Sequence, residues 1–75
     1  MDLILTTFGT YLHRQGEMFL IKVKEQKQEV SSRKVRSIVI TTGASLSTDA
    51  IQLAIEKNID IVFLDAVGHP YGRIW

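Results

Sequence analysis

The sequence predicts a small α+β domain, mostly β, in which a sandwich-like antiparallel β-sheet is covered by one helix. Short apolar segments rich in β-branched residues recur along the chain, most clearly at 37–41 and 61–64. Only the segment 49–57 spaces its apolar residues as a helix does. Glycines such as Gly9 and Gly16 separate the segments. Many short strands with a single helix are typical of this class.

The first half of the chain is expected to form four strands. An apolar opening at 1–7 reads as a buried strand that ends before Phe8 and Gly9. A hairpin of strands 10–14 and 17–24 follows, with one dry face in the second strand. The remaining elements are a turn at 25–28, a weak edge strand at 29–32 and a basic connection at 33–36.

The second half contains the helix. Strand 37–41 leads through the loop 42–44 to a helix that Ser47 or Thr48 caps. Asn58 suits the left-handed residue that ends it. The expected buried stripe consists of Ile51, Ala54 and Ile55. The last elements are a buried strand at 60–64, a turn at 67–70 and a strand at 71–75.

The size of the chain predicts a partner. A domain of 75 residues buries only about 60% of the surface of its unfolded chain. The chain has no Cys, which excludes disulfides and thiolate zinc sites. Support is therefore expected from a second copy or from a further domain. No apolar run approaches the length of a membrane span and no signal peptide is evident, so we expect a cytoplasmic protein.

Basic residues are concentrated in one stretch. Residues 20–36 hold six bases and two acids, a local charge of +4, and the rest of the chain holds three bases and six acids, a local charge of −3. The favoured interpretation is a solvated hairpin whose charged edges discourage aggregation. The alternative is a surface that meets phosphate.

Three groups of residues are candidate sites. Asp60, Asp65 and His69 flank one strand and could form a metal site, but strand ends and turns explain them better. The loop Thr42-Gly43-Ala44-Ser45 could cradle a phosphate, but it lacks the spacing and the Lys of a phosphate loop. Exposed rings at Phe8 and Tyr11 could stack on an unpaired base, although both are expected in the core.

Several segments in series match one known family. They are Leu3-Ile4-Leu5, Phe8-Gly9, Gly16, Ser37-Ile38-Val39-Ile40 and Ala44-Ser45-Leu46-Ser47. The most specific piece is N-I-D-I-V-F-L-D after the helix, and G-H-P-Y-G-R-I-W at the end fits a Gly turn and a Gly-Arg strand. In this order they resemble the N-terminal β domain of the CRISPR-associated adaptation endonuclease and integrase, the Cas-one family. The resemblance covers essentially the whole chain.

The resemblance implies that residues 1–75 are the N-terminal β domain of a larger DNA endonuclease and integrase that acquires CRISPR spacers in antiviral defence. In that family a helical C-terminal domain, absent from this segment, holds a divalent Mg²⁺ or Mn²⁺ ion. We therefore expect no catalytic residue and no metal ligand here, and a segment inactive alone. The implied partners are a second copy in a homodimer, the second core CRISPR adaptation protein and double-stranded DNA. The implied role is dimerisation and the building of a DNA-binding platform.

The charge pattern and the resemblance together give the phosphate candidates. These are Arg14, Arg33, Lys34, Arg36 and Arg73, which we expect to make sequence-independent DNA contacts. A second interpretation stays open: a stand-alone β-rich protein-interaction module with no nucleic-acid role. A small complete enzyme is disfavoured, because the sequence offers no set of nucleophile, base and pocket.

Overall fold

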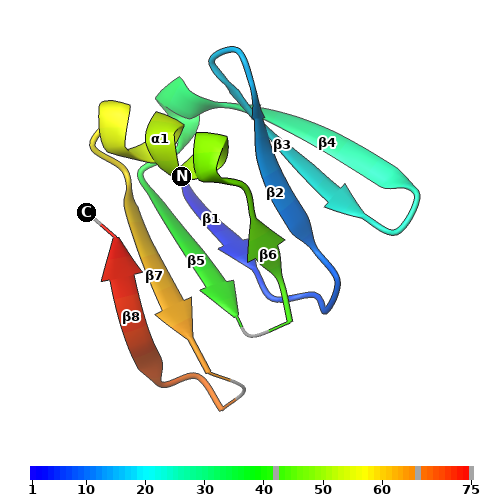
Figure 1. Cartoon of the computed structure of the whole chain (residues 1–75), viewed down its shortest axis with the longest axis vertical. Coiled ribbons are helices and arrows are strands. Elements are labelled where there is room, and N and C mark those ends of the chain that lie inside the picture. Colours follow the sequence, from blue (N-terminus) through cyan, green and yellow to red (C-terminus); the bar gives the residue numbers. More distant parts are fainter. Residues whose placement is uncertain (42, 66, 75) are drawn as a thin grey trace.

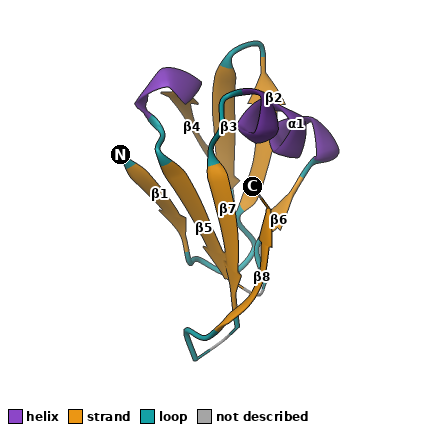
Figure 2. Cartoon of the chain, turned by 90° about the vertical axis from the view of Figure 1, so that its left-hand side faces the viewer, coloured by secondary structure: helices purple, strands orange, loops and turns teal. Residues whose placement is uncertain are grey.

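The computed structural model describes residues 1–41, 43–65 and 67–74, which form two four-stranded sheets and one α-helix (Figures 1 and 2). The first sheet has the order β1 (Asp2–Leu5), β5 (Ser37–Thr41), β7 (Asp60–Leu64) and β8 (Pro70–Ile74). The second has the order β4 (Gln26–Ser31), β3 (Met18–Val23), β2 (Tyr11–Gln15) and β6 (Ser45–Leu46). A 3₁₀ turn, η1 (Ser32–Lys34), joins β4 to β5.

The predicted fold class, α+β and mostly β with one helix, is confirmed. The antiparallel expectation holds for β2, β3 and β4 and for the pair β7 and β8. The strands β1, β5 and β7 are parallel, and β6 runs parallel to β2. Parallel strands need long crossover connections. Here the second sheet connects β1 to β5, and the helix α1 (Thr48–Glu56) connects β5 to β7.

The core lies between the two sheets and beneath the helix. Alternate residues of each strand point inward, as the period of two requires. The fully buried side chains of largest volume are Leu12, Phe19, Ile38, Ile40, Leu53 and Ile61. The helix closes one side of this sandwich and contacts β2 and β7 (Figure 2).

The predicted ends of the helix are confirmed, but one residue of its predicted stripe is wrong. The Oγ of Ser47 accepts a hydrogen bond from the Ala50 amide at 3.2 Å, and Asn58 is left-handed with φ of 57°. Ala50 and Leu53 are buried, whereas Ile55 is 53% exposed. The helix contacts β2 and β7 with the side that carries Leu53. Ile55 follows two residues later, about 200° around the helix, and therefore lies on the opposite side.

The hairpin of β3 and β4 corrects a predicted turn. We expected a turn at 25–28, but the chain reverses at Lys24 and Glu25, and β4 already begins at Gln26. Lys24 adopts a left-handed conformation with φ of 57°, which makes a tighter turn possible. The short strand β6 was not predicted. In the described part of the chain, no helix has the length and hydropathy needed to cross a membrane.

Candidate nucleic-acid interface

Three of the five predicted phosphate contacts are engaged in ion pairs. Arg14 Nη2 lies 3.4 Å from a carboxylate oxygen of Glu56, and Arg73 Nη2 lies 2.9 Å from Asp60. Arg36 donates from Nε and Nη2 to the two carboxylate oxygens of Asp2, at 3.1 and 2.8 Å. The side chain is 80% exposed for Arg36, 53% for Arg73 and 21% for Arg14, and in each pair the acid offsets part of the positive charge.

The pair of Asp2 and Arg36 is the most strongly coupled of these. Hydrogen bonds from Arg36 and then from the Ser37 hydroxyl lower the pKa of Asp2 to about 2. The same carboxylate raises the pKa of Arg36. Asp2 is paired in register with Ser37, and Ser37 with Asp60, so these acids lie in one row across the first sheet.

The remaining two candidates, Arg33 and Lys34, lie on η1 without an acidic partner among the described residues. The amino terminus of the chain donates to the Lys34 carbonyl, which places η1 beside the start of β1. The pKa of Glu17 is lowered by Lys57, 3.0 Å away, and further by Arg14 and Arg33. The structure therefore brings all five predicted residues toward one end of the domain.

Phe8 lies in the loop between β1 and β2, at the opposite end of β1 from η1 (Figure 1). The prediction that Phe8 belongs to the core is wrong, because the residue is 84% exposed. Burial was expected because aromatic rings usually lie in the core, but the strand ends at Leu5 and Phe8 lies in the loop that follows. Tyr11 was also expected in the core and is 37% exposed.

Backbone contacts hold the Phe8 loop in place. The amide of Gly9 donates to the Gly43 carbonyl at 2.9 Å, and the amide of Thr10 donates to the Thr7 carbonyl at 3.1 Å. The Thr10 hydroxyl donates to the same carbonyl at 2.7 Å, and Thr10 itself is buried. Phe8 is therefore an apolar ring projecting from an ordered loop, and an exposed ring of this kind can stack on a nucleobase.

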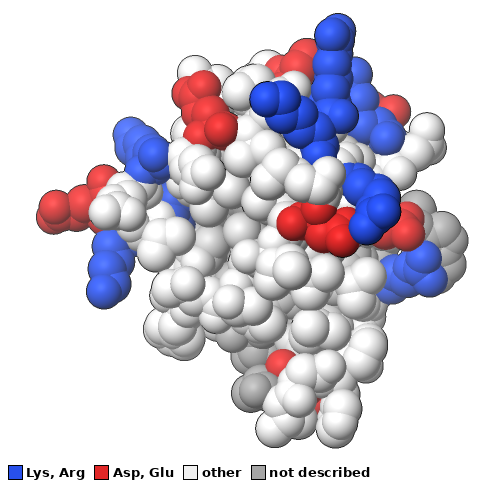
Figure 3. All heavy atoms as spheres, turned by 180° about the vertical axis from the view of Figure 1, so that it is seen from behind, with Lys and Arg blue, Asp and Glu red and all other residues white. Residues whose placement is uncertain are grey.

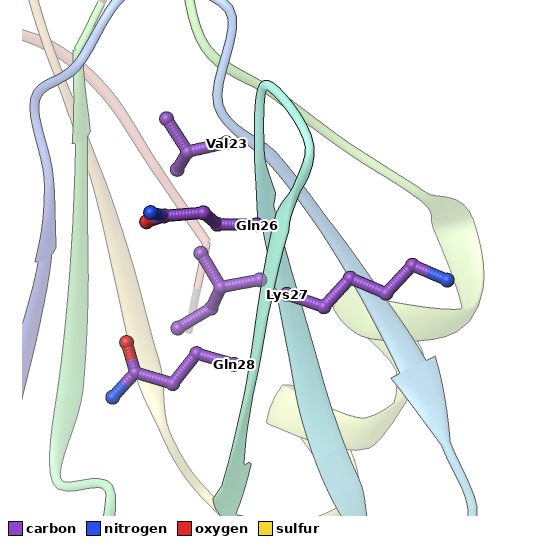
Figure 4. Close-up of a pocket in the computed structure, with 5 residues that line it drawn as sticks. Val23, Gln26, Lys27 and Gln28 are labelled. Carbon is purple, nitrogen blue, oxygen red and sulfur yellow. The ribbon is translucent and has the colours of Figure 1, made fainter.

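A hollow lies along the β3–β4 hairpin, on the side of the hairpin that faces β1 (Figure 4). It has a volume of about 400 Å³ and is lined by Ile21 and by residues of the hairpin. Val23, Gln26 and Gln28 point to the side that faces β1, whereas Lys27 points away from it (Figure 4). Aliphatic and amide side chains without a paired acid and base do not support acid–base catalysis.

The contacts of Asp60, Asp65 and His69 do not fit a metal site. Asp60 is paired with Arg73, and Asp65 Oδ1 accepts hydrogen bonds from the amides of Val67 and His69 at 3.0 and 2.8 Å. The Asp65 carboxylate thus stabilises the turn before β8. In residues 1–41, 43–65 and 67–74, no three His, Cys, Asp or Glu side chains gather as metal ligands would.

The loop before α1 does not form a phosphate cradle either. Its first residue, Thr42, lies outside the described residues. The Ser47 cap occupies an amide of the first turn, and the Ser47 hydroxyl donates to the Asp49 carboxylate. That hydrogen bond lowers the pKa of Asp49, which keeps a negative charge at this helix end. An anionic ligand is therefore disfavoured there.

Sequence reasoning missed the lysines of the β3–β4 hairpin. Lys22 and Lys27 are directly opposite each other in the antiparallel register. The alternation of side chains along β3 predicts that Lys22 points outward. The residue that lies opposite Lys22 on β4 depends on the position of the turn between the two strands. The turn signal was the polar run that begins at Glu25, and it does not specify a reversal at Lys24.

Comparison with known proteins identifies related sequences. The model of the family described as CRISPR associated protein Cas1 matches residues 3–75. The CRISPR-associated endonuclease Cas1 2 of Saccharolobus solfataricus is 34% identical over 70 residues, covering 93% of this chain and 23% of the relative. The endonuclease Cas1 1 of Archaeoglobus fulgidus is 32% identical over 75 residues, covering 99% of this chain and 22% of the relative. The chain thus spans less than a quarter of these curated relatives.

Solved structures show the same fold at low sequence identity. A Cas1 protein from Thermotoga maritima superposes with a TM-score of 0.85 at 17% identity, over 100% of this chain and 24% of that one. A chain of a partial Cas6-RT-Cas1–Cas2 complex gives 0.91 at 13% identity, over 99% and 23%. A chain of a TtCas1–DNA complex gives 0.75 at 12% identity, over 91% and 24%.

Proposed function

This chain belongs to the CRISPR-associated Cas1 family, and from that premise we propose that it is the N-terminal β domain of a DNA endonuclease and integrase of CRISPR adaptation. Its proposed role is to pair two copies and to form part of the platform that holds DNA. The reaction is proposed to use a divalent ion, Mg²⁺ or Mn²⁺, held by residues outside this segment. The second core adaptation protein is the proposed partner of the whole assembly.

The observation that carries the DNA role is the exposed ring of Phe8 on a fixed loop. An aromatic ring that is 84% exposed gains little for the fold, because its apolar surface stays in water. Stacking on a nucleobase would cover that surface without requiring a particular base. An unpaired base at the end of a duplex is the accessible form of such a partner. Phe8 is therefore proposed to receive a DNA end.

The five predicted cations support a second part of the platform. Arg33 and Lys34 have no acidic partner among the described residues, and the guanidinium groups of Arg14, Arg36 and Arg73 are at least partly exposed. Phosphate contacts by such groups supply sequence-independent affinity that falls with salt. The variant Arg33→Ala/Lys34→Ala/Arg36→Ala should bind DNA more weakly and with a flatter salt dependence.

The ring is tested by changing Phe8 in the full-length protein. Stacking contributes about 1–3 kcal/mol per base, so Phe8→Ala should weaken binding to a duplex with unpaired ends about 5- to 150-fold. Phe8→Trp keeps a stacking surface and serves as the matched control, which should bind nearly as tightly as the parent. Equal affinity of the Ala and Trp variants would contradict the proposed DNA role of this loop.

The proposed pairing of two copies is supported by exposed apolar residues on the first sheet. Ile4 is 61% exposed. It is paired in register with Val39, and Val39 is paired with Val62. Both valines are only partly buried. An apolar row on a sheet face is a common feature of interaction surfaces. Light scattering over a dilution series measures the mass of the protein. A dimer that persists on dilution is expected. A monomer throughout would contradict the proposed pairing and would point to a further domain or another protein as the partner.

A further inference from the structure

Five described cations have no acidic side chain within 4.0 Å, and they fall into two groups. Arg33 and Lys34 lie on η1, and Lys22, Lys24 and Lys27 lie on the β3–β4 hairpin. Seen from behind, basic atoms gather at the top of the molecule and at the left edge, where the hairpin lies (Figure 3). The hairpin group is the one that the family resemblance did not single out.

The arrangement of this hairpin costs stability. Lys22 and Lys27 face each other directly across β3 and β4, and like charges in that relationship repel. Lys24 holds φ of 57° at the turn, a conformation that favours Gly or Asn over a lysine. Local features that oppose the fold are expected where a ligand, absent in the free protein, compensates for them.

Two of these lysines, Lys22 and Lys27, lie in register with exposed polar and aromatic groups. The register places Ser45, Tyr11, Lys22 and Lys27 side by side in one row across β6, β2, β3 and β4. At about 4.8 Å between neighbouring strands, the row spans about 14 Å. The ring of Tyr11 is stacked on that of His13 with centroids 5.2 Å apart, which fixes its orientation. A row of this composition fits a strand of phosphates and bases.

The row begins beside the Phe8 loop. Ser45 follows two residues after Gly43, against which the ring of Phe8 packs. At the other side of that loop, Thr7 lines one hollow of about 620 Å³ together with Lys24 and Glu25. The hairpin lysines are therefore at the same end of the domain as Phe8, whereas Arg33 and Lys34 are at the opposite end (Figure 1).

We propose that the outer face of the β2–β3–β4 sheet is a phosphate-contact surface for the DNA strand whose end Phe8 receives. This inference rests on the proposed function, and it assigns contacts to Lys22, Lys24 and Lys27. Glu25 and Glu29 lie on the same hairpin, so its net charge is +1. The surface therefore acts through individual lysine–phosphate contacts at short range, and the two glutamates weaken its attraction for DNA.

The test compares two triple variants of the full-length protein that remove the same charge at opposite ends. Lys22→Gln/Lys24→Gln/Lys27→Gln alters the hairpin, and Arg33→Gln/Lys34→Gln/Arg36→Gln alters η1 and its neighbour. Fluorescence anisotropy with a labelled duplex carrying unpaired ends gives the affinity between about 50 and 200 mM salt. The hairpin variant should reduce the slope of log K against log salt by about 0.9 per lost contact, or about 2.7 in all.

Two further results decide the matter. Glu25→Gln/Glu29→Gln should bind the same duplex more tightly than the parent, a gain of function that misfolding does not produce. An unchanged slope for the hairpin variant, with a reduced slope for the η1 variant, would overturn this inference and leave the proposed function standing. Unchanged slopes for both triple variants, together with unchanged binding by Phe8→Ala, would overturn both.

Discussion

The ring of Phe8 packs against Gly43 so closely that a Cβ on Gly43 would lie 2.5 Å from Phe8 Cδ2 and 2.9 Å from Cε2. Gly43 also has φ of 98°, a conformation that L-residues other than glycine rarely adopt. Its carbonyl accepts the Gly9 amide, so the two loops are joined at this point. The glycine thus sets both the position of the Phe8 loop and the side from which the ring is open to a ligand.

Replacement of Gly43 by Ala should therefore affect both stability and DNA binding. The strained backbone and the displaced ring should lower the free energy of unfolding by about 1–3 kcal/mol. Binding to duplex DNA with unpaired ends should weaken because the ring is moved. Gly16→Ala is the matched control, since Gly16 has φ of 62° but no atom within 4 Å of an added Cβ. Urea denaturation and anisotropy measure the two effects, and equal DNA affinity of both variants would contradict the prediction.

The pair of Asp2 and Arg36 predicts a dependence of stability on acid. Because Arg36 lowers the pKa of Asp2 to about 2, the folded state binds the Asp2 proton less readily than the unfolded state. The stabilisation is complete above the unfolded pKa near 4 and is lost as the pH falls toward 2. Asp2→Asn should remove this part of the pH dependence.

Thermal unfolding between about pH 5 and pH 2 provides the measurement. The parent should lose more stability than Asp2→Asn over the lower part of that range. Asp65→Asn is a useful control. Asp65 accepts hydrogen bonds from backbone amides of a turn, so its substitution leaves the pair of Asp2 and Arg36 intact. If the stabilities of the parent and Asp2→Asn fell in parallel with pH, the ion pair would not contribute to stability in solution.

The elements that sequence analysis predicted correctly are those fixed by local physics. The alternation of Ile38 and Ile40 specifies a buried strand, and both residues are buried at the centre of the first sheet. A Ser before a helix and an Asn after it satisfy the free backbone groups at its ends, so Ser47 and Asn58 could be recognised without tertiary information. The family resemblance, now confirmed, rested on the order of such elements.

The parts that were missed depend on contacts between distant positions. Asp2 and Arg36 are 34 residues apart, and their pairing requires β1 and β5 to lie side by side and parallel. The opposition of Lys22 and Lys27 requires the turn at Lys24. Phe8 looked like a core residue because aromatic rings are usually buried, and only the end of β1 at Leu5 reveals otherwise.

The corrected face of α1 gives a direct test of the packing. Leu53 is fully buried in the core, so Leu53→Ala should lower the free energy of unfolding by about 2–5 kcal/mol. Ile55 is 53% exposed, so Ile55→Ala should change it by less than about 1 kcal/mol. Urea denaturation of the two variants measures the difference. Comparable losses would place Ile55 inside the core, as the sequence first indicated.

The repulsion between Lys22 and Lys27 predicts opposite effects of one substitution on stability and on DNA binding. Lys27→Thr removes a like charge and introduces a residue that favours strands, so stability should rise by about 0.2–1 kcal/mol. The same change removes one proposed phosphate contact. The magnitude of the slope of log K for DNA binding against log salt should therefore fall by about 0.9. Lys34→Thr is the matched control, because it removes the same charge from η1. Among the described residues no lysine is paired with Lys34, so this variant should not be more stable than the parent. If Lys27→Thr were less stable than the parent, the lysine pair would not be a cost of folding, and the reason to seek a ligand for it would disappear.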